Sequence, residues 1–346
     1  LAMLTAALLR TVGSPFPAAK EVHTQSNETR RLYLCAVKNR MPFLYLEALK
    51  ERTNLEGEFK NVYSAMSQRC LKTYEVILEA SNVLQETDVE YAVFKTIRPY
   101  PFITVDIDIL IFGGEEEYEQ SLKAFTKAKY EKLGYGPNST TFQALKMNMG
   151  IDLYKEVAVS HIVYLDKNKL NSHVVDRRVL KNREKIKTLS PIADLLAIIA
   201  HSVIKEHLYT ISEYYSTLYF VKEMDENDLI NFIDAAEENR LINAVKTHIG
   251  ITASLHKMAY GTIPKKIVKV LDVLGTNYFE IKRLKESNFK TPHKFHVLTV
   301  VGALLEKMKE EKAKRSMVEQ FKNMTRVSFA KRVFTDLINH IKRETY

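Results

Sequence analysis

Apolar residues recur at helical spacing through most of the first ninety residues of the chain. Within residues 27–90 they follow a period near 3.6 residues, which predicts helices, and the polar stretch 54–57 separates two of them. The spacing changes at 91–95, a short apolar run, and the segment 105–112 then alternates apolar and polar side chains. Alternation with a period of two is typical of a strand with one buried face. The pattern therefore predicts amino-terminal helices followed by a sheet.

The next segment predicts one more helix and a hairpin. Residues 115–133 place apolar side chains on one helical stripe, with Gly134 expected to end the helix, and the stripe contains Tyr118, Leu122, Phe125, Ala128 and Leu133. The extended runs 141–147 and 151–159 follow. Asn148, Met149 and Gly150 separate them, which is typical of a tight hairpin. Together these elements predict a small mixed sheet backed by helices.

Helical spacing returns after the sheet and continues to the last residue. Ser190 is expected to be an N-cap and Pro191 the first helical residue, and the apolar run 193–208 predicts a long, uninterrupted helix. Breaks at 225–227, 261–264 and 291–292 separate further helices. We therefore predict an α+β protein with three units: amino-terminal helices packing on the core (1–88), a small mixed β-sheet core with flanking helices (89–187), and a carboxy-terminal α-helical domain (188–346).

Cysteine content and the start of the chain narrow the class of protein. Cys35 and Cys70 are the two cysteines among 346 residues and do not form a CxxC pair, so no disulfide framework or zinc site is expected. The chain begins LAMLTAALL, which is apolar but too short to span a bilayer, and no basic stretch precedes it. We expect a cytoplasmic protein without a membrane partner, and no heptad or exposed apolar stripe indicates its oligomeric state.

The chain is basic, and much of the excess charge lies near its end. The net charge is +9, and residues 306–346 contain 11 basic and 6 acidic side chains. An excess of lysine and arginine favours polyanions such as nucleic acid or nucleotide phosphates. A solvated helix face is the more common explanation of such a run, and an RNA-binding surface is the alternative.

Two aspartates on the alternating segment are the first candidates for chemistry. Asp106 and Asp108 share one face of the predicted strand, and the isoleucines between and after them share the other. Carboxylates this close repel each other unless a cation lies between them, and Mg²⁺ prefers such hard oxygen ligands. Taken alone, the pair also fits the wet face of an edge strand. Asp152, between apolar Ile151 and Leu153 on the second hairpin strand, can complete a triad.

The surroundings of these aspartates resemble a known family. The segment LEASNVLQETDVEYAVFKTIRPYPFITVDIDILI (78–111) is similar to the signature region of the nucleotidyltransferase superfamily that contains DNA polymerase beta. The closer likeness is to uncharacterised nucleotidyltransferases related to the transferases of toxin and antitoxin pairs, in which Phe-Lys-Gly or Leu-Lys-Gly precedes an Asp-Ile-Asp strand. Here Phe94, Lys95 and Thr96 occupy that element. Ile151-Asp152-Leu153 and the apolar run with His201 extend the likeness over residues 75–220.

The resemblance implies an activity and a set of residues. It implies transfer of a nucleoside monophosphate from a nucleoside triphosphate such as ATP to a hydroxyl of RNA (tRNA, for example), protein or a small molecule. Two Mg²⁺ ions would be held by Asp106, Asp108 and Asp152. The superfamily places Gly-Gly or Gly-Ser ahead of its aspartates, whereas this chain has Lys95 and Thr96 in that place. Thr96 lies ten residues before Asp106.

Five further residues are predicted to bind the nucleotide phosphates. A lysine amine and a threonine hydroxyl suit phosphate oxygens by charge and hydrogen bonding, and a guanidinium can brace a phosphate. The predicted phosphate-binding residues are Lys95, Thr96, Arg98, His201 and Lys205. The alternative for Arg98 is a position at the surface, and the alternative for His201 is a position in the core. The alternative function is a catalytically degenerate protein of the same fold that binds RNA or a partner.

Overall fold

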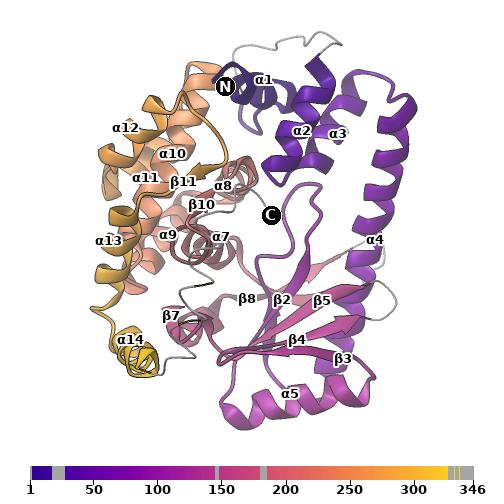
Figure 1. The fold of residues 1–346 in the computed structure, drawn as a ribbon, viewed down its shortest axis with the longest axis vertical. Coiled ribbons are helices and arrows are strands. Elements are labelled where there is room, and N and C mark those ends of the chain that lie inside the picture. The colour runs from indigo at the N-terminus through magenta and orange to yellow at the C-terminus, as the bar shows by residue number, and fades with distance from the viewer. Residues whose placement is uncertain are drawn as a thin grey trace.

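The computed structural model describes residues 2–17, 28–144, 148–179, 185–325, 331 and 335. Helices precede and follow a central sheet (Figure 1). The helices before the sheet are α1 (Ala2–Val12), α2 (Thr29–Lys38), α3 (Pro42–Arg52) and α4 (Gly57–Gln85). The break predicted at 54–57 is confirmed, because α3 ends and α4 begins there.

The central sheet is mixed, as the sequence predicts. Its strand order is β3-β4-β5-β2-β1-β9-β8, with β2 parallel to β5, β1 parallel to β9, and the other neighbours antiparallel. The strands are β1 (Tyr91–Val93), β2 (Asp106–Ile111), β3 (Glu131–Tyr135), β4 (Ser139–Ala144), β5 (Met149–Tyr154), β8 (Val174–Arg178) and β9 (Lys185–Leu189). Helix α5 (Glu115–Lys127) connects β2 to β3. A small ribbon of β6 (Val157–Val159) and β7 (Ile162–Leu165) follows β5, and the short helix α6 (Lys167–Leu170) comes next.

Helices make up most of the described chain after the sheet. They are α7 (Pro191–Ala200), a π-helix (His201–Glu206), α8 (Ile211–Glu223), α9 (Glu226–Glu238), α10 (Ile242–Tyr260), α11 (Lys265–Leu274), α12 (Tyr278–Glu286), α13 (Val297–Lys307) and α14 (Glu311–Met324). Two short strands, β10 (Leu208–Tyr209) and β11 (His293–Lys294), pair with each other. Asp225 caps α9 by accepting a hydrogen bond from the backbone N–H of Asp228, and Gly261 ends α10 at a φ of 77°.

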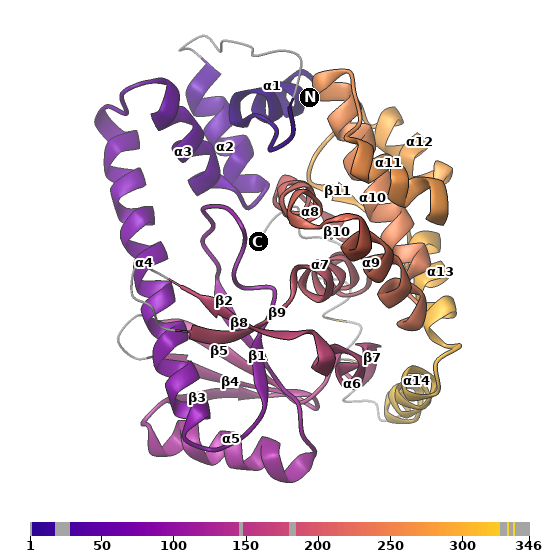
Figure 2. The same ribbon diagram turned by 180° about the vertical axis from the view of Figure 1, so that it is seen from behind.

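The two faces of the sheet belong to different cores. On one face, α4 and α5 cover apolar side chains that alternate along the strands. This core includes Val76, Ile77, Ala80, Leu84, Ile107, Ile109, Tyr118, Leu122, Phe125, Ile151 and Leu153. The opposite face contributes Ala92, Leu110 and Tyr154 to a larger core shared with α7 and the other late helices. Figure 2 shows α7 beside the sheet from behind, where it contacts β9 and β7.

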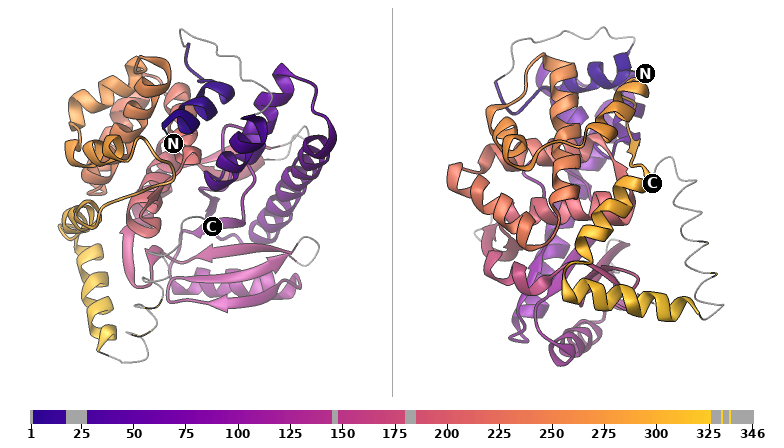
Figure 3. Two further views of the ribbon diagram at one scale, coloured as in Figure 1. Left: turned by 45° about the horizontal axis from the view of Figure 1, so that its top comes forward. Right: turned by 90° about the vertical axis from the view of Figure 1, so that its left-hand side faces the viewer.

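The amino-terminal helices pack on two different parts of the protein. Helix α4 lies along the sheet, whereas α1 lies against the late helices (Figure 3). Arg10 donates to the carbonyl of Ala259 on α10 at 2.8 Å, and the hydroxyl of Tyr215 on α8 donates to the carbonyl of Leu9 at 3.3 Å. The division of the chain at residues 88 and 187 stays a prediction.

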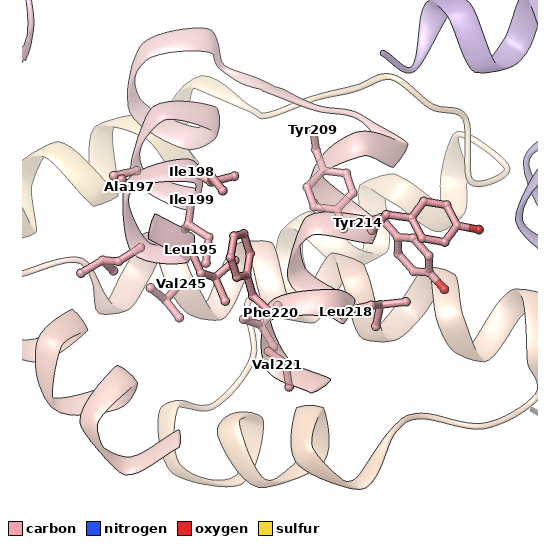
Figure 4. Packing of buried hydrophobic residues seen from close by; sticks show 14 of the residues in the cluster. Leu195, Ala197, Ile198, Ile199, Tyr209, Tyr214, Leu218, Phe220, Val221 and Val245 are labelled. Atoms are coloured by element: carbon pink, nitrogen blue, oxygen red, sulfur yellow. The ribbon is translucent and has the colours of Figure 1, made fainter. Parts of the chain in front are cut away.

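The helical region is built around large buried side chains. Figure 4 shows Tyr209, Tyr214, Leu218 and Phe220 packed with residues of α7 and with Val245 of α10. Tyr209 donates or accepts a hydrogen bond with the hydroxyl of Thr252 at 2.6 Å, so the polar end of this buried ring has a partner. The core thus joins helices that are distant in the sequence.

Several predicted boundaries are wrong. Helix α5 ends at Lys127, and Gly134 lies within β3 instead of ending the helix, so Leu133 is exposed on a strand. Met149 and Gly150 are the first residues of β5 instead of part of the hairpin connection, and residues 145–147 lie outside the described ranges. Strand β2 begins at Asp106, which leaves Val105 exposed.

The long helix predicted over 193–208 is interrupted. It is α-helical to Ala200, continues as a π-helix to Glu206, and stops at His207 in the left-handed conformation. Short π-segments are rare and occur frequently at functional sites. Two of the predicted site residues, His201 and Lys205, lie on this one.

Helix α13 exposes part of its apolar surface. Helix α13 turns apolar side chains outward as well as inward, and the exposed ones are Val297, Leu298, Val301, Leu305 and, just beyond the helix, Met308. No helix of the described ranges combines the length and apolar character needed to cross a bilayer. Residues 326–330 and most of 331–346, which carry part of the predicted basic tail, lie outside the description.

Candidate functional site

The three predicted carboxylates lie together on one face of the sheet. Asp108 on β2 is directly paired with Asp152 on the parallel strand β5, and Asp106 is two residues earlier on β2. Because side chains alternate along a strand, Asp106, Asp108 and Asp152 share the face that Leu110 and Tyr154 also occupy. The aspartates are half-buried, whereas Ile107 and Ile151 on the opposite face are fully buried.

The electrostatics of the carboxylates show uncompensated negative charge. Burial raises the pKa of Asp106 to about 6, and the charges of Asp108 and Asp152 add to the effect. Burial also raises the pKa of Asp152, although a hydrogen bond from the Thr141 hydroxyl, 2.5 Å long, opposes the shift. Within the described ranges the Asp106 carboxylate has neither a hydrogen bond nor an ion pair. This side chain is therefore the one most open to an added cation.

Lys95 brings a buried amine to the carboxylates from the loop after β1. Its Nζ lies 3.5 Å from Oδ1 of Asp108, and its side chain is only 4% exposed. The amine also lies 4.6 Å from the ring centre of Phe94 and 5.0 Å from that of Tyr154. Burial lowers the pKa of Lys95, while Asp108 and Asp106 oppose that shift. The rings and the carboxylates thus form an environment for a cation.

The backbone of Lys95 is held in a conformation that most residues avoid. Its φ is 56°, in the left-handed region, which destabilises a non-glycine residue by roughly 1–2 kcal/mol. Its N–H donates to Oδ1 of Asp194, in the first turn of α7, at 2.6 Å. Asp194 is buried, and burial raises its pKa to about 6 against the opposing charge of Arg98. Asp194, which the sequence analysis did not single out, therefore anchors Lys95.

His201 connects Lys95 to a second acidic residue. Its Nδ1 lies 3.3 Å from Nζ of Lys95, and its Nε2 lies 3.3 Å from Oε1 of Glu206. An ammonium can only donate, so Nδ1 accepts and Nε2 carries the hydrogen that is donated to Glu206. Burial, with the charges of Lys95 and Lys205, lowers the pKa of His201 to about 3. The imidazole is therefore neutral at physiological pH and holds the Lys95 amine in place.

Two tyrosines complete the surroundings of the carboxylates and were missed by the sequence analysis. Tyr154 follows Asp152 by two residues on β5, and burial, together with the negative charge of Asp108, raises its pKa well above the usual value. Tyr164 on β7 places its hydroxyl 3.4 Å from Nδ1 of His201. Period-two spacing from Asp152 predicts that Tyr154 shares its face, but nothing local in the sequence indicates Tyr164.

Lys205, on the π-helix, brings a second positive charge to the carboxylates. Its positive charge opposes the rise in the pKa of both aspartates, and its Nζ lies 5.9 Å from the ring centre of Tyr154. The side chain is half-buried, unlike that of Lys95. Lys205 therefore remains available to a ligand that enters from solvent.

The Thr96 hydroxyl has hydrogen-bond partners within the protein, and its expected contact with phosphate stays a prediction. Its hydroxyl donates to the carbonyl of Phe94 at 3.1 Å and accepts from the N–H of Asp108 at 2.9 Å. A hydroxyl has one hydrogen, and Phe94 takes it, so Thr96 cannot also donate to a phosphate oxygen in this arrangement. The side chain instead continues the hydrogen bonding between β1 and β2 where β1 ends, and so positions Asp108.

We expect Thr96→Val to destabilise the protein by about 1–3 kcal/mol, because the N–H of Asp108 would lose its acceptor in a partly buried position. Urea unfolding measures the change. Thr96→Ser keeps the hydroxyl and is the matched control, expected to lose less than half as much. A clear loss in Thr96→Ser beside no loss in Thr96→Val, which keeps the methyl group, would show that packing of the methyl group, and not the hydrogen bond, is what matters.

Arg98 does not join the carboxylates. Its Nε and Nη1 are buried without a hydrogen-bond partner in the described structure, and its guanidinium lies 5.3 Å from the ring centre of Phe102. It lines a small cavity against α4 together with Cys70, Tyr74 and Thr104. Its charge acts on Asp194 instead of on the triad, so its expected contact with phosphate stays a prediction.

The carboxylate oxygens are suitable ligands for Mg²⁺, although the three side chains do not converge on a common metal position. Three carboxylates without a cysteine are the oxygen donors that a hard cation prefers, and Asp106 has an unpaired charge. In the described ranges, however, no three His, Cys, Asp or Glu side chains are close enough together to hold a metal ion. Asp106, Asp108 and Asp152 are the residues that would hold it.

We expect binding of Mg²⁺ to weaken as the pH falls through about 6, where Asp106 takes up a proton. Protons and metal ions compete for the same carboxylate, so raising the Mg²⁺ concentration should move the midpoint to lower pH. Calorimetric titration between pH 5 and pH 8 at two ion concentrations measures this, with Asp106→Asn as the variant that lacks the titrating group. A midpoint that does not move with Mg²⁺ would argue against Asp106 as a ligand.

Comparison with known proteins adds no family to this picture. No protein-family model matches the chain, and no curated protein matches it either.

Proposed function

We propose that the protein is a metal-dependent nucleotidyltransferase. An acceptor hydroxyl would attack the α-phosphorus of a nucleoside triphosphate, a new P–O bond would form, and the bond between the α- and β-phosphates would break. Pyrophosphate leaves, and the hydroxyl proton passes to a neighbouring base. Bound Mg²⁺ would supply positive charge to the phosphate oxygens and lower the pKa of the attacking hydroxyl.

The observation that supports this proposal most is the pairing of Asp108 with Asp152 on parallel strands, with Asp106 on the same face. Two acidic residues on one strand are common on wet surfaces. Here the third lies beside them, burial and mutual repulsion raise the pKa of Asp106, and two lysines from distant segments face the group. A surface strand does not need such an arrangement, whereas a site for cations and phosphates does.

Each residue has a defined part in the proposed reaction. Asp106, Asp108 and Asp152 would hold the metal, and Asp152, whose pKa is raised, would draw the proton from the acceptor hydroxyl. Lys205 is half-buried and would meet the charge of the triphosphate as it enters. His201 would act through Lys95 as a positioning residue. The acceptor is proposed to be RNA such as tRNA, a protein or a small molecule.

The test is turnover of labelled nucleoside triphosphates with Mg²⁺, using cellular RNA and proteins as acceptors. Pyrophosphate release together with transfer of label supports the proposal and identifies the class of acceptor. Release of pyrophosphate without transfer would indicate hydrolysis and would remove the acceptor hydroxyl from the scheme.

A non-catalytic binding protein is the second candidate, and one observation favours it. Lys95 stands within ion-pair distance of Asp108, and the described carboxylates do not converge on a metal position. Such a protein would bind RNA with a strong dependence on salt, consume no nucleotide, and keep its function in Asp108→Ala. RNA binding by wild type and Asp108→Ala across a range of salt concentrations, measured beside turnover, separates the two candidates.

A further inference from the structure

The Lys95 amine occupies a place among the carboxylates that a cation would be expected to fill. It lies 3.5 Å from Asp108. Its electrostatic interactions extend to Asp106 and, on the other strand, to Asp152. An ordinary lysine keeps its ammonium in water, but this side chain is 4% exposed. One positive charge is therefore already built into the group of three negative charges.

The Lys95 amine is fixed on all sides. Its backbone N–H is bound to Asp194, its Nζ is 3.3 Å from the neutral Nδ1 of His201, and the rings of Phe94 and Tyr154 flank it. The left-handed backbone directs this side chain into the site from a loop. Withdrawing the amine would break its contacts with His201 and with both rings together, so a metal ion could not easily displace it.

In a site with two metal ions, the carboxylates must supply ligand oxygens to both ions. Such ions lie about 3.5–4 Å apart and share bridging carboxylates. Here one oxygen of Asp108 faces the Lys95 amine, and Oδ1 of Asp152 accepts a hydrogen bond from Thr141. Asp106 alone of the three has no such partner among the described residues. The carboxylates thus retain capacity for one divalent ion.

We propose that Lys95 supplies the positive charge of one of the two metal ions, so that the site binds a single divalent cation. This inference rests on the proposed function, because it assumes that the carboxylates bind a metal at all. The ammonium neutralises carboxylate charge and can donate to a phosphate oxygen, but it does not act as a Lewis acid. Removal of the acceptor proton therefore falls to Asp152.

The number of bound ions tests the inference without any need for turnover. Mn²⁺ alone is titrated into the full-length protein, and the bound ion is counted from the loss of the free-ion electron paramagnetic resonance signal. We expect one Mn²⁺ per chain in the wild type and two in Lys95→Met, whose side chain is similar in length and uncharged. Lys205→Met, a matched change at the half-buried neighbouring lysine, should keep the count at one.

Each other outcome has a defined meaning. Two ions in the wild type, or one in Lys95→Met, would overturn the inference and leave the proposed function standing. A triple variant with asparagine at 106, 108 and 152 gives the background; no binding above it in any protein would overturn the proposed function and the inference with it. If Lys95→Met fails to fold, the wild-type count still decides.

A second measurement uses stability. Without metal, Lys95→Met leaves three carboxylates without their internal cation, so its thermal midpoint in EDTA should fall by several degrees and recover with Mn²⁺. The wild-type midpoint should respond less to the same change. An equal response of the two proteins would contradict the role of Lys95 as a built-in cation.

Discussion

Replacing both Asp106 and Asp108 by alanine is expected to reduce nucleotidyl transfer by roughly 10³-fold or more, equivalent to about 4 kcal/mol of transition-state stabilisation. The two side chains carry charge on the same strand face and lie beside Asp152. Without them, one carboxylate is left to hold the metal, and the charge that develops on the phosphates has no fixed counter-ion. Transfer of label and release of pyrophosphate should fall together.

The control for this prediction is an exposed aspartate on another strand of the same sheet. Asp176 lies on β8, paired with Lys185 at the surface, and Asp176→Ala should leave transfer unchanged. The double variant also leaves the buried Lys95 amine without its counter-charges, so urea unfolding is measured beside transfer and the rate is given per folded molecule. Transfer that survives in Asp106→Ala/Asp108→Ala would refute the catalytic proposal and favour the binding-protein alternative.

Asp194→Ala is expected to destabilise the protein by about 2–4 kcal/mol and to lower transfer further than the loss of folded protein explains. The substitution removes the acceptor of the Lys95 N–H and the counter-charge of buried Arg98. Lys95 would then have no partner to hold its left-handed backbone. Urea unfolding measures the first effect, and the rate per folded molecule measures the second.

Asp194→Asn distinguishes the two contributions of this side chain. Its carbonyl oxygen can still accept from the Lys95 N–H, whereas the negative charge beside Arg98 is lost. We expect the rate per folded molecule to be largely restored in Asp194→Asn while stability is restored only in part. A rate that falls equally in both variants would show that charge, and not the placement of Lys95, is what Asp194 provides.

The candidate aspartates could be predicted because their geometry is local. A strand alternates its side chains, so Asp106 and Asp108 must share a face wherever the strand lies, and Ile107 must face the other way. The structure confirms this alternation and places Asp152 on the neighbouring parallel strand. The mixed sheet flanked by helices was also predictable, because the long helices and β2 show their periods, although β1, with three residues, does not.

Predictions of boundaries failed where local preference competes with the rest of the fold. Glycine is a common residue at helix ends. Gly134 nevertheless lies in β3, because pairing with β4 extends the sheet to that segment. The run 193–208 has no helix breaker, and the π-turn at His201 is invisible in its composition. The outer face of α13 was missed for a related reason: apolar residues on both faces leave no period to detect.

The sequence by itself indicated that helices precede and follow a mixed sheet and that three aspartates can face one another. Only the tertiary structure decided what surrounds them, because those contacts join segments far apart in the chain. Lys95 meets Asp194 across 99 positions and His201 across 106. Burial then sets the pKa of each group, and burial depends on what packs above the sheet, which no local pattern encodes.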